Sequence, residues 1–434
     1  MAERAGLSQP ARLTLRAAMV VLLALPTLLG RVSSPLVLLL SLFVFVRPGL
    51  PALLRLGPQN RADRLFVAGF ILIVLAALAA AGSPSDLGFI VNFLPFLLVP
   101  PLRRAFGSLN DRNPALRVGQ LALCGAVASL AFALLQWLVL GALRPGELTM
   151  NAIQFANTAM LMGFLSLSGW FAPGPRRRWW FLLGPFAGMF AVLLSGTRGA
   201  VLAVPLLSVI AFSIELLRSP RRREIALWGL GILAGLALVV ILAAALGFTR
   251  GLTLVSDFRT LVEGGAVDQS INERLTLYKA GIKTFWGSPF TGFGWGDLVT
   301  AVLPEVSPDL RARMSQFSHL HNGLLSFAIG SGAFGIVAFG LFSFAPALGL
   351  RDLPPDGQSA ARVHVALTLV AAFQIFQLTN ILLGYDFHTI QFVVVTALAL
   401  GYMRDPESPA AAAAPKGGTR NHDRARRHRR NRRG

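Results

Sequence analysis

Charged residues are scarce in this chain. Only 14% of its 434 residues are charged, whereas 54% are hydrophobic. A soluble domain carries about 25% charged residues, so this chain has too little polar surface for a soluble globule of its size. It holds a single cysteine, Cys124, which excludes an intrachain disulfide. It also lacks the alternation of apolar and polar residues that transmembrane β-strands require.

Acidic residues are the scarcer of the two charges, and the net charge is +20. The basic residues lie in short clusters between apolar runs and in residues 404–434, which hold ten Lys or Arg and three acids. This distribution is typical of the cytoplasmic loops of membrane proteins, where basic residues also attract anionic lipid head groups. We therefore predict contacts with membrane lipids and no nucleic-acid partner.

Apolar runs of 15 to 25 residues recur from Ala17 to Met403, and this length crosses about 30 Å of hydrocarbon. Backbone groups in lipid must be satisfied within their own segment, which leaves helices as the solution. We predict an all-α polytopic membrane protein with about twelve transmembrane helices and cytoplasmic termini. Alternating basic loops place the spans at residues 17–31, 34–52, 65–82, 87–101, 118–141, 152–172, 179–195, 199–217, 225–248, 322–349, 363–383 and 388–403.

The longest stretch between spans, about residues 249–320, is predicted to be a large, partly helical periplasmic loop. It holds seven basic and seven acidic residues, unlike the basic loops assigned to the cytoplasm, and loops of this length are usually functional. We expect residues 1–403 to form a single transmembrane domain without a cleavable signal peptide. Residues 404–434 are expected to form a basic cytoplasmic tail without fixed structure.

Metal and nucleotide chemistry find little support in the sequence. No predicted loop contains an Asp-x-Asp pair that would hold a divalent ion on a nucleotide-sugar. Residues 286–296 are rich in glycine but lack the Lys and Ser/Thr of a nucleotide-binding loop, so we expect a turn-rich interfacial element. His319 and His321 lie two residues apart without a nearby acidic or cysteine cluster, which is weak metal spacing. We predict no metal and no cofactor.

Two arginines stand out on the predicted periplasmic side. Arg198 lies between Gly196 and Gly199 in the turn that joins two spans, and Arg274 lies in a predicted helix in the large loop. Arginine binds phosphate bidentately, so the two residues suit a phosphate or pyrophosphate. One alternative stays open for each residue. Arg198 can instead anchor a helix end at the interface, and Arg274 can instead lie on a solvated helix face beside Glu273.

His321 lies where the large loop enters the next predicted span. A neutral imidazole can accept a proton near neutral pH, so His321 is a candidate general base. It can also be read as an interfacial polar residue, or as a residue that positions an acceptor without proton transfer.

Three motifs stand out in the sequence. They are His321-Asn322 followed after nine residues by Gly332-Ala333-Phe334-Gly335, the turn Ser195-x-x-Arg198-Gly199, and Arg274 followed by Pro289-x-x-Gly292-x-Gly294. Together they resemble the motifs of the O-antigen ligase family, part of a larger superfamily of ligases and O-antigen polymerases. The predicted architecture of the whole chain is similar as well. The chain departs from the family at Ile336, where many members carry Thr.

The resemblance implies transfer of O-antigen polysaccharide from undecaprenyl pyrophosphate to a sugar hydroxyl of lipid A–core. It implies a membrane-embedded glycosyltransferase fold, a site at the periplasmic face of the cell inner membrane, inversion at the anomeric carbon, and no need for metal or nucleotide. We assign His321 as the general base and Arg198 and Arg274 as catalytic and pyrophosphate-binding residues. The further residues assigned to substrate binding are Tyr278, Lys279, His319 and Asn322.

Two other functions stay open at this point. An O-antigen polymerase would use a growing glycan as its acceptor. A lipid-linked glycan flippase or transporter would also hold a pyrophosphate with arginines, but along a cavity near the middle of the membrane. A protein O-oligosaccharyltransferase is less favoured, because no soluble region is predicted after the last span.

Overall fold

The structure is a computed structural model. It describes residues 8–46, 59–82, 84–174, 178–219, 222–248, 268–296, 298–384 and 386–405, together with positions 253, 259, 260, 262 and 263. Every regular element within these residues is helical, as the sequence predicted. Nearly all of the predicted tail lies outside the described residues, as do the basic positions 176, 177 and 221.

The first part of the chain begins with short, bent helices and continues with longer ones. Its elements are α1 (Gln9–Met19), a π-helical turn (Val20–Ala24), α2 (Pro26–Leu29), a 3₁₀ turn (Gly30–Val32), α3 (Ser33–Val46), α5 (Arg61–Ala80), the 3₁₀ helix η3 (Pro84–Leu98), α6 (Val99–Gly107), α7 (Pro114–Leu138), α8 (Ala152–Leu165) and α9 (Ser168–Phe171).

The second part contains the large loop and the helices on either side of it. Its elements are the 3₁₀ turn η4 (Trp179–Leu182), α10 (Leu183–Ser195), α11 (Arg198–Val201), α12 (Ala203–Arg218), α13 (Arg222–Ala245), α15 (Gln269–Phe285), α16 (Leu298–Val302), a 3₁₀ turn (Leu303–Glu305), α17 (Pro308–Met314), α18 (Gly323–Gly349), a 3₁₀ turn (Leu350–Asp352), α19 (Ser359–Phe376), α20 (Asp386–Ala397) and a π-helical turn (Leu398–Tyr402).

Six helical stretches in the described part are long and apolar enough to cross a membrane. They are Arg61–Ala80, Asp86–Gly107, Pro114–Leu138, Arg198–Arg218, Gly323–Asp352 and Ser359–Phe376. A seventh is added if Gln9–Ala24 and Pro26–Ser41 form one span, and three shorter apolar helices are Trp179–Ser195, Gly229–Ala245 and Phe387–Tyr402. The chain is therefore a polytopic α-helical protein of the membrane type, while the count of twelve spans stays a prediction.

Two predicted spans have a backbone geometry that hydropathy did not reveal. The residues predicted as a span at 87–101 begin as a 3₁₀ helix of 15 residues with Pro95 inside it. Such helices rarely exceed three or four residues. Pro26 lies inside the first predicted span, residues 17–31, and the helical stretches on its two sides, Gln9–Ala24 and Pro26–Ser41, meet at a bend of 83°. Proline lacks a backbone N–H and disfavours helical geometry in the residue before it, which accounts for the bend.

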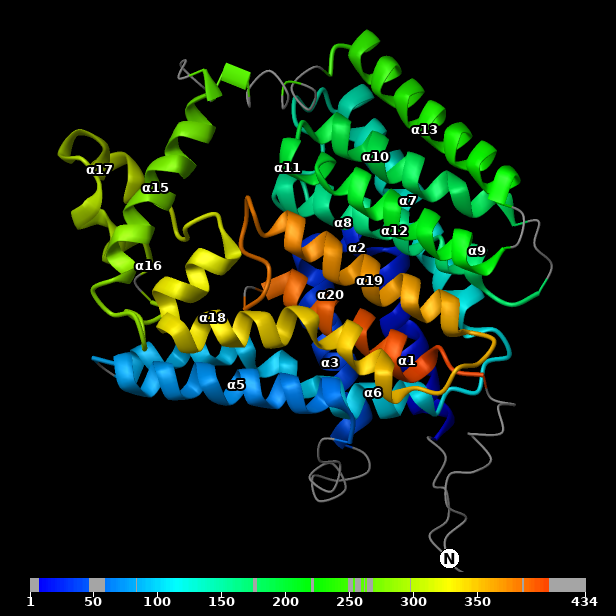
Figure 1. The fold of residues 1–434 in the computed structure, drawn as a ribbon, viewed down its shortest axis with the longest axis horizontal. Coiled ribbons are helices and arrows are strands. Elements are labelled where there is room, and N and C mark those ends of the chain that lie inside the picture. The colour runs from blue at the N-terminus through cyan, green and yellow to red at the C-terminus, as the bar shows by residue number, and fades with distance from the viewer. Residues whose placement is uncertain are drawn as a thin grey trace, which may run out of the picture.

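The long helices α5 and α18 lie side by side (Figure 1) and enclose an aromatic core. Phe96 of η3 stacks on Phe342 of α18 with ring centroids 3.9 Å apart, and Phe66 of α5 lies 5.8 Å from Phe96. A Cβ atom on Gly69 would lie 2.7 Å from the Phe342 ring, so glycine is what allows α5 to approach this closely. Between helices in lipid, such close packing replaces the hydrophobic effect as the source of attraction.

A second group of helices, α7, α8 and α10, packs through small residues. A Cβ atom on Gly163 of α8 would lie 2.7 Å from the carbonyl oxygen of Gly184, and one on Gly188 of α10 would lie 2.6 Å from that of Ala159. Glycines of this kind let membrane helices approach backbone to backbone. The contact fixes α10, whose C-terminal end carries the Arg198 turn.

The basic segments predicted to face the cytoplasm meet at one end of the molecule, here called the basic end. Arg103 donates to both carboxylate oxygens of Asp63, at 3.1 and 2.7 Å, and this pair is buried. Further ion pairs that join segments there are Arg61–Asp352, Arg362–Asp356, Arg16–Asp111 and Arg117–Asp111. Figure 1 shows α15, α16 and α17 together at the left, beside the opposite end of α18, which is called the loop end.

This arrangement predicts which thiols an impermeant reagent reaches. In a Cys124→Ala variant, Ser315→Cys at the loop end should be labelled from the periplasmic side, whereas Asn110→Cys at the basic end should react only after the inner membrane is permeabilised. Both positions are exposed. Ser195, the natural choice in the Arg198 turn, is buried and would be a poor probe. Labelling of Asn110→Cys in cells with an intact inner membrane would invert the predicted topology.

Candidate functional site

The turn around Arg198 is fixed by its own hydrogen bonds. α10 ends at Ser195, and Gly196 adopts the left-handed conformation, with a φ of 67°, that stops a helix without a steric penalty. Thr197 Oγ1 donates to the carbonyl oxygen of Ala152 at 3.3 Å, which ties the turn to the start of α8. A Cβ atom on Gly199 would collide with Thr379, so this glycine accommodates the protein's own chain.

α15 is the helix predicted in the large loop, and its first turn reaches Arg198. Asp268 caps the helix by accepting a hydrogen bond from the backbone N–H of Ser270 at 2.9 Å. The same carboxylate lies 3.4 Å from Nη2 of Arg198. Asp268 was an isolated acid in the sequence, and its position before a helix was the one signal that could have singled it out.

Arg274 is partly buried and lies close enough to Arg198 and the two histidines for their charges to interact. Its neighbour Glu273 forms an ion pair of 2.6 Å with Arg313. Burial lowers the pKa of Arg274, and the positive charge of Arg198 lowers it further, against the raising effect of Tyr278. Two guanidinium groups that repel each other in this way are a favourable place for an anion. A solvated helix face beside Glu273 is therefore not what the structure shows for Arg274.

Tyr278 lies one turn after Arg274 on the same face of α15. Its hydroxyl oxygen is 2.7 Å from the carbonyl oxygen of His321 and 2.9 Å from that of Leu378. Burial raises the pKa of Tyr278 to about 12, so the hydroxyl stays protonated and able to donate at neutral pH. Tyr278 thus joins α15 to the start of α18 and to the end of α19.

Asn322 is the N-cap of α18 and fixes the residue before it. Its side chain accepts from the backbone N–H of Leu325 at 2.9 Å, and the backbone N–H of Gly323 donates to the carbonyl oxygen of Gln377 at 2.8 Å. His321 has a φ of 53° and is the one non-glycine residue with a positive φ in the described part of the chain. This conformation costs about 1–3 kcal/mol and concentrates at functional sites.

The imidazole of His321 is packed between two other rings. Its centroid is 4.3 Å from that of His319 and 5.2 Å from that of Phe317. Burial lowers the pKa of His321 to about 3, with smaller contributions from His319 and Arg274. The ring is therefore neutral at pH 7, and its Nδ1 is buried without a hydrogen-bond partner.

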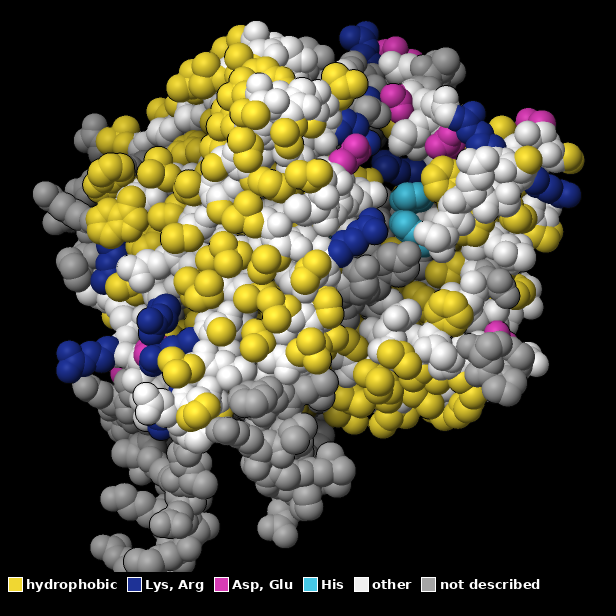
Figure 2. All heavy atoms as spheres, turned by 180° about the vertical axis from the view of Figure 1, so that it is seen from behind, with side chains coloured by type: hydrophobic (Ala, Val, Ile, Leu, Met, Phe, Trp, Pro, Cys, Tyr) yellow, Lys and Arg dark blue, Asp and Glu magenta, His cyan; other side chains and the backbone are white. Residues whose placement is uncertain are grey.

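His319 belongs to the same cluster but has more polar contacts. Its Nδ1 lies 3.0 Å from Ser318 Oγ, and its side chain also bonds to Asn380. Burial lowers the pKa of His319 as well. Figure 2 shows the visible histidine side chains in cyan next to Lys or Arg side chains in dark blue.

Six of the seven predicted site residues come together. They are Arg198, Arg274, Tyr278, His319, His321 and Asn322. Lys279 does not join them: it is exposed on another face of α15, because consecutive residues of a helix point about 100° apart. Sequence reasoning missed Asn380 and the carbonyl of Leu378, for which no motif gave a signal.

The two glycine motifs pack against each other. α18 is interrupted at Ser331 and Gly332, where Gly332 has a φ of 57°. The turn-rich segment that follows α15 fits into this break: the N–H groups of Phe293 and Gly294 donate to the carbonyls of Ile329 and Gly330 at 2.8 and 3.2 Å. In return, the N–H of Ala333 donates to the carbonyl of Pro289 at 2.7 Å.

This break explains the two glycines of the histidine motif, Gly332 and Gly335. A Cβ atom on Gly332 would collide with the backbone of Phe290, and one on Gly335 with the carbonyl of Phe327. Both glycines are therefore needed for the chain to adopt the broken conformation. Trp295 packs against the break as well: its Nε1 donates to Ser331 Oγ at 2.8 Å, and its ring centroid lies 4.7 Å from that of Phe93.

Comparison with known families agrees with the motifs. Residues 181–340 match the model of a family described as O-antigen ligase. This stretch begins before α10 and ends within α18, so it contains the whole cluster except the end of α19. No curated protein matches the chain. The match supports the O-antigen ligase and polymerase family in general, whose members are membrane enzymes that act on lipid-linked glycans. Residues 181–340 of this chain are thus a domain of the O-antigen ligase family.

Proposed function

We propose that this protein is an O-antigen ligase, which transfers O-antigen polysaccharide from undecaprenyl pyrophosphate to a sugar hydroxyl of lipid A–core at the periplasmic face of the inner membrane. The observation that carries the proposal is the convergence of Arg198, Arg274 and His321 from three separate segments. A pair of arginines beside a neutral imidazole matches a reaction that expels a diphosphate and removes a proton.

The two arginines would bind the diphosphate of the donor. Negative charge builds on the diphosphate as the bond between its oxygen and the anomeric carbon breaks, and preorganised donors stabilise that charge. The guanidinium groups of Arg198 and Arg274 would supply the positive charge that a divalent ion supplies in other transferases. Arg274 is held by α15 and Arg198 by the turn after α10, so neither depends on the other for its position.

His321 would act as the general base. Its imidazole would take the proton of the acceptor hydroxyl while the hydroxyl oxygen forms a bond to the anomeric carbon, opposite the departing diphosphate, with inversion. A pKa of about 3 keeps the ring neutral but makes it a weak base. A bound diphosphate would raise this pKa, because nearby negative charge favours the imidazolium. His321 would then become a stronger base when the donor is bound.

The neighbours of His321 would have supporting roles. Tyr278 donates to the carbonyl of the strained residue itself, and Asn322 caps the helix that follows it. Asn322 and His319 would line the approach of the acceptor sugar. Lys279 is exposed and has no contact with the cluster in the described residues, so its assignment to substrate binding is not part of this proposal.

The choice of acceptor tests the function. Purified protein with undecaprenyl-pyrophosphate-linked O-antigen should transfer glycan to lipid A–core, and the product can be resolved by gel electrophoresis. A growing donor glycan offered as the only acceptor should give no product. Extension of the donor glycan in place of lipid A–core would instead identify a polymerase. Absence of any transfer, with donor moving between leaflets of vesicles, would identify a transporter.

Replacing His321 by Asn should abolish the chemical step. Asparagine tolerates a positive φ, so His321→Asn preserves the backbone while removing the proton acceptor. We expect turnover to fall by about 10² to 10⁴ with donor binding retained, and a smaller loss for His319→Asn.

The pH profile gives an independent check on the same assignment. The folded-state pKa of His321 is depressed, so its base form persists as the pH falls through the ordinary histidine range. kcat/KM, which reports the free enzyme, should therefore stay level from pH 7 to pH 5. A titration centred near pH 6.5 that disappears in His319→Asn would transfer the role of base to His319.

Arg198→Lys should lose activity on the order of a hundredfold, the typical effect of removing one preorganised donor. Lysine keeps the charge but not the planar fork that binds two phosphate oxygens. Arg313→Lys is a matched control, because Arg313 pairs with Glu273 on the large loop outside the cluster. Steady-state kinetics on both variants test whether Arg198 binds the diphosphate. Wild-type activity in Arg198→Lys would show that Arg198 only anchors a helix end at the interface.

A further inference from the structure

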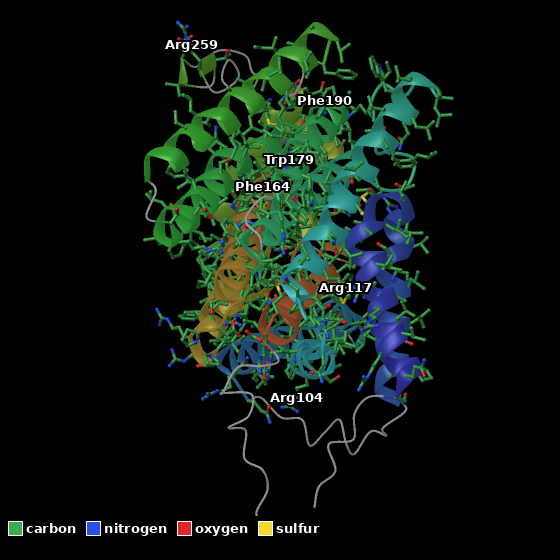
Figure 3. The ribbon with its side chains drawn as sticks, turned by 90° about the vertical axis from the view of Figure 1, so that its right-hand side faces the viewer. Arg104, Arg117, Phe164, Trp179, Phe190 and Arg259 are labelled. Atoms are coloured by element: carbon green, nitrogen blue, oxygen red, sulfur yellow. The ribbon has the colours of Figure 1, made fainter. Side chains whose placement is uncertain are left out.

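A second candidate site lies away from the histidine cluster, toward the basic end. A cavity of about 690 Å³, here called the apolar cavity, is bounded by α8, α9, α10, α12 and α13. Its lining is almost wholly apolar and includes Phe164 (labelled in Figure 3), Met189, Val204, Phe212, Leu236 and Val240. Pockets of about 300–1,000 Å³ are typical of bound small molecules.

The apolar cavity continues into a polar one. A smaller pocket of about 100 Å³, here called the polar pocket, is formed by residues 170, 172–174, 215, 218 and 219, and it shares Trp170 and Glu215 with the apolar cavity. It lies at the basic end, because the carbonyl of Pro173 in its wall accepts a hydrogen bond of 2.9 Å from Asn113, just before α7. An apolar space with a polar cap at the membrane surface matches an amphiphile.

The polar pocket contains one charge of each sign. Arg218 Nη1 lies 3.7 Å from Glu215 Oε2, and Trp170 Nε1 donates to the same oxygen at 3.3 Å. Both charged side chains are partly exposed, at 37% and 28%, and an ion pair of this kind contributes little to stability. Little free energy is therefore lost when this ion pair separates and each residue binds an opposite charge of a ligand instead. A ligand that carries both a phosphate and an ammonium satisfies both.

The length of the cavity favours a lipid of one leaflet. From Val204 to Glu215, α12 advances roughly 16 Å, close to half of the hydrocarbon thickness of about 30 Å. An acyl chain that starts at the basic end would fill this depth. A long polyprenyl chain would overrun it, and a diphosphate placed at Glu215 would be repelled by the carboxylate.

We propose that the apolar cavity and the polar pocket bind one glycerophospholipid with a zwitterionic ethanolamine head group, drawn from the leaflet at the basic end. The phosphate would bind Arg218, the ammonium would bind Glu215, and an acyl chain would run between α12 and α13 toward the level of Val204. The site is independent of the proposed transferase reaction. Because α12 continues from the Arg198 turn, the lipid would also support the helix that holds Arg198.

Lipid retention by the purified full-length protein tests the proposal. The protein is incubated with vesicles of phosphatidylethanolamine and phosphatidylglycerol in equal amounts, repurified in detergent, and its bound lipids are counted by native mass spectrometry. We expect phosphatidylethanolamine to be retained about tenfold over phosphatidylglycerol, which corresponds to about 1.4 kcal/mol. Glu215→Gln should remove this preference, and Arg218→Gln should lower the retention of both lipids.

Two tryptophan variants separate the cavity from general effects on folding. Ala211 lines the apolar cavity, so Ala211→Trp should fill it and reduce retention at least tenfold. Ala234→Trp is the matched control, since Ala234 is exposed on α13 and does not line the cavity. Equal retention of the two phospholipids by the wild type, or full retention by a folded Ala211→Trp, would overturn the proposal. Displacement of phosphatidylethanolamine by added undecaprenyl phosphate would assign the cavity to a polyprenyl chain instead.

Discussion

A broken helix in a membrane leaves backbone N–H and C=O groups that lipid cannot satisfy, and this constraint organises the loop end of the molecule. The break at Ser331 and Gly332 lies about 12 Å along α18 from its first residue. The free groups on both sides of it are taken up by the segment from Pro289 to Gly294. The large loop is thereby fastened to the bundle by main-chain hydrogen bonds, which do not depend on the identity of exposed side chains.

The candidate site follows from that attachment. α15 leads directly into the fastened segment, so its position is set from its C-terminal end, and Tyr278 fixes it again at His321 and Leu378. Arg274 then lies near enough to both His321 and Arg198 for their charges to interact. Hydrogen bonds of neighbouring residues hold each of the three segments: Thr197 beside Arg198, Asp268 at the start of α15, and Asn322 beside His321. An arrangement of this kind keeps catalytic side chains in place without requiring them to bind one another.

Much of this could be predicted from the sequence, and the failures have physical causes. Apolar length gave the helical membrane class, and the Gly196 turn and the helix of Arg274 were visible as local patterns. Hydropathy records apolar length but not backbone geometry, so neither the 3₁₀ helix η3 nor the break at Gly332 was foreseen. Lys279 was assigned to substrate binding together with Tyr278, but helical periodicity places the two adjoining side chains on different faces.

The contact between Arg198 and Asp268 affects both donor binding and product release in the proposed catalytic cycle. Arg198 already has a counter-ion in Asp268, so arrival of a donor diphosphate would be an exchange of anions rather than the capture of an anion by a bare cation. Because the diphosphate must displace the Asp268 carboxylate from Arg198, its ground-state binding would be weaker. The same carboxylate stands ready to return when the spent diphosphate carrier departs. A residue at the start of α15 thereby sets how readily the site empties and becomes available for another round.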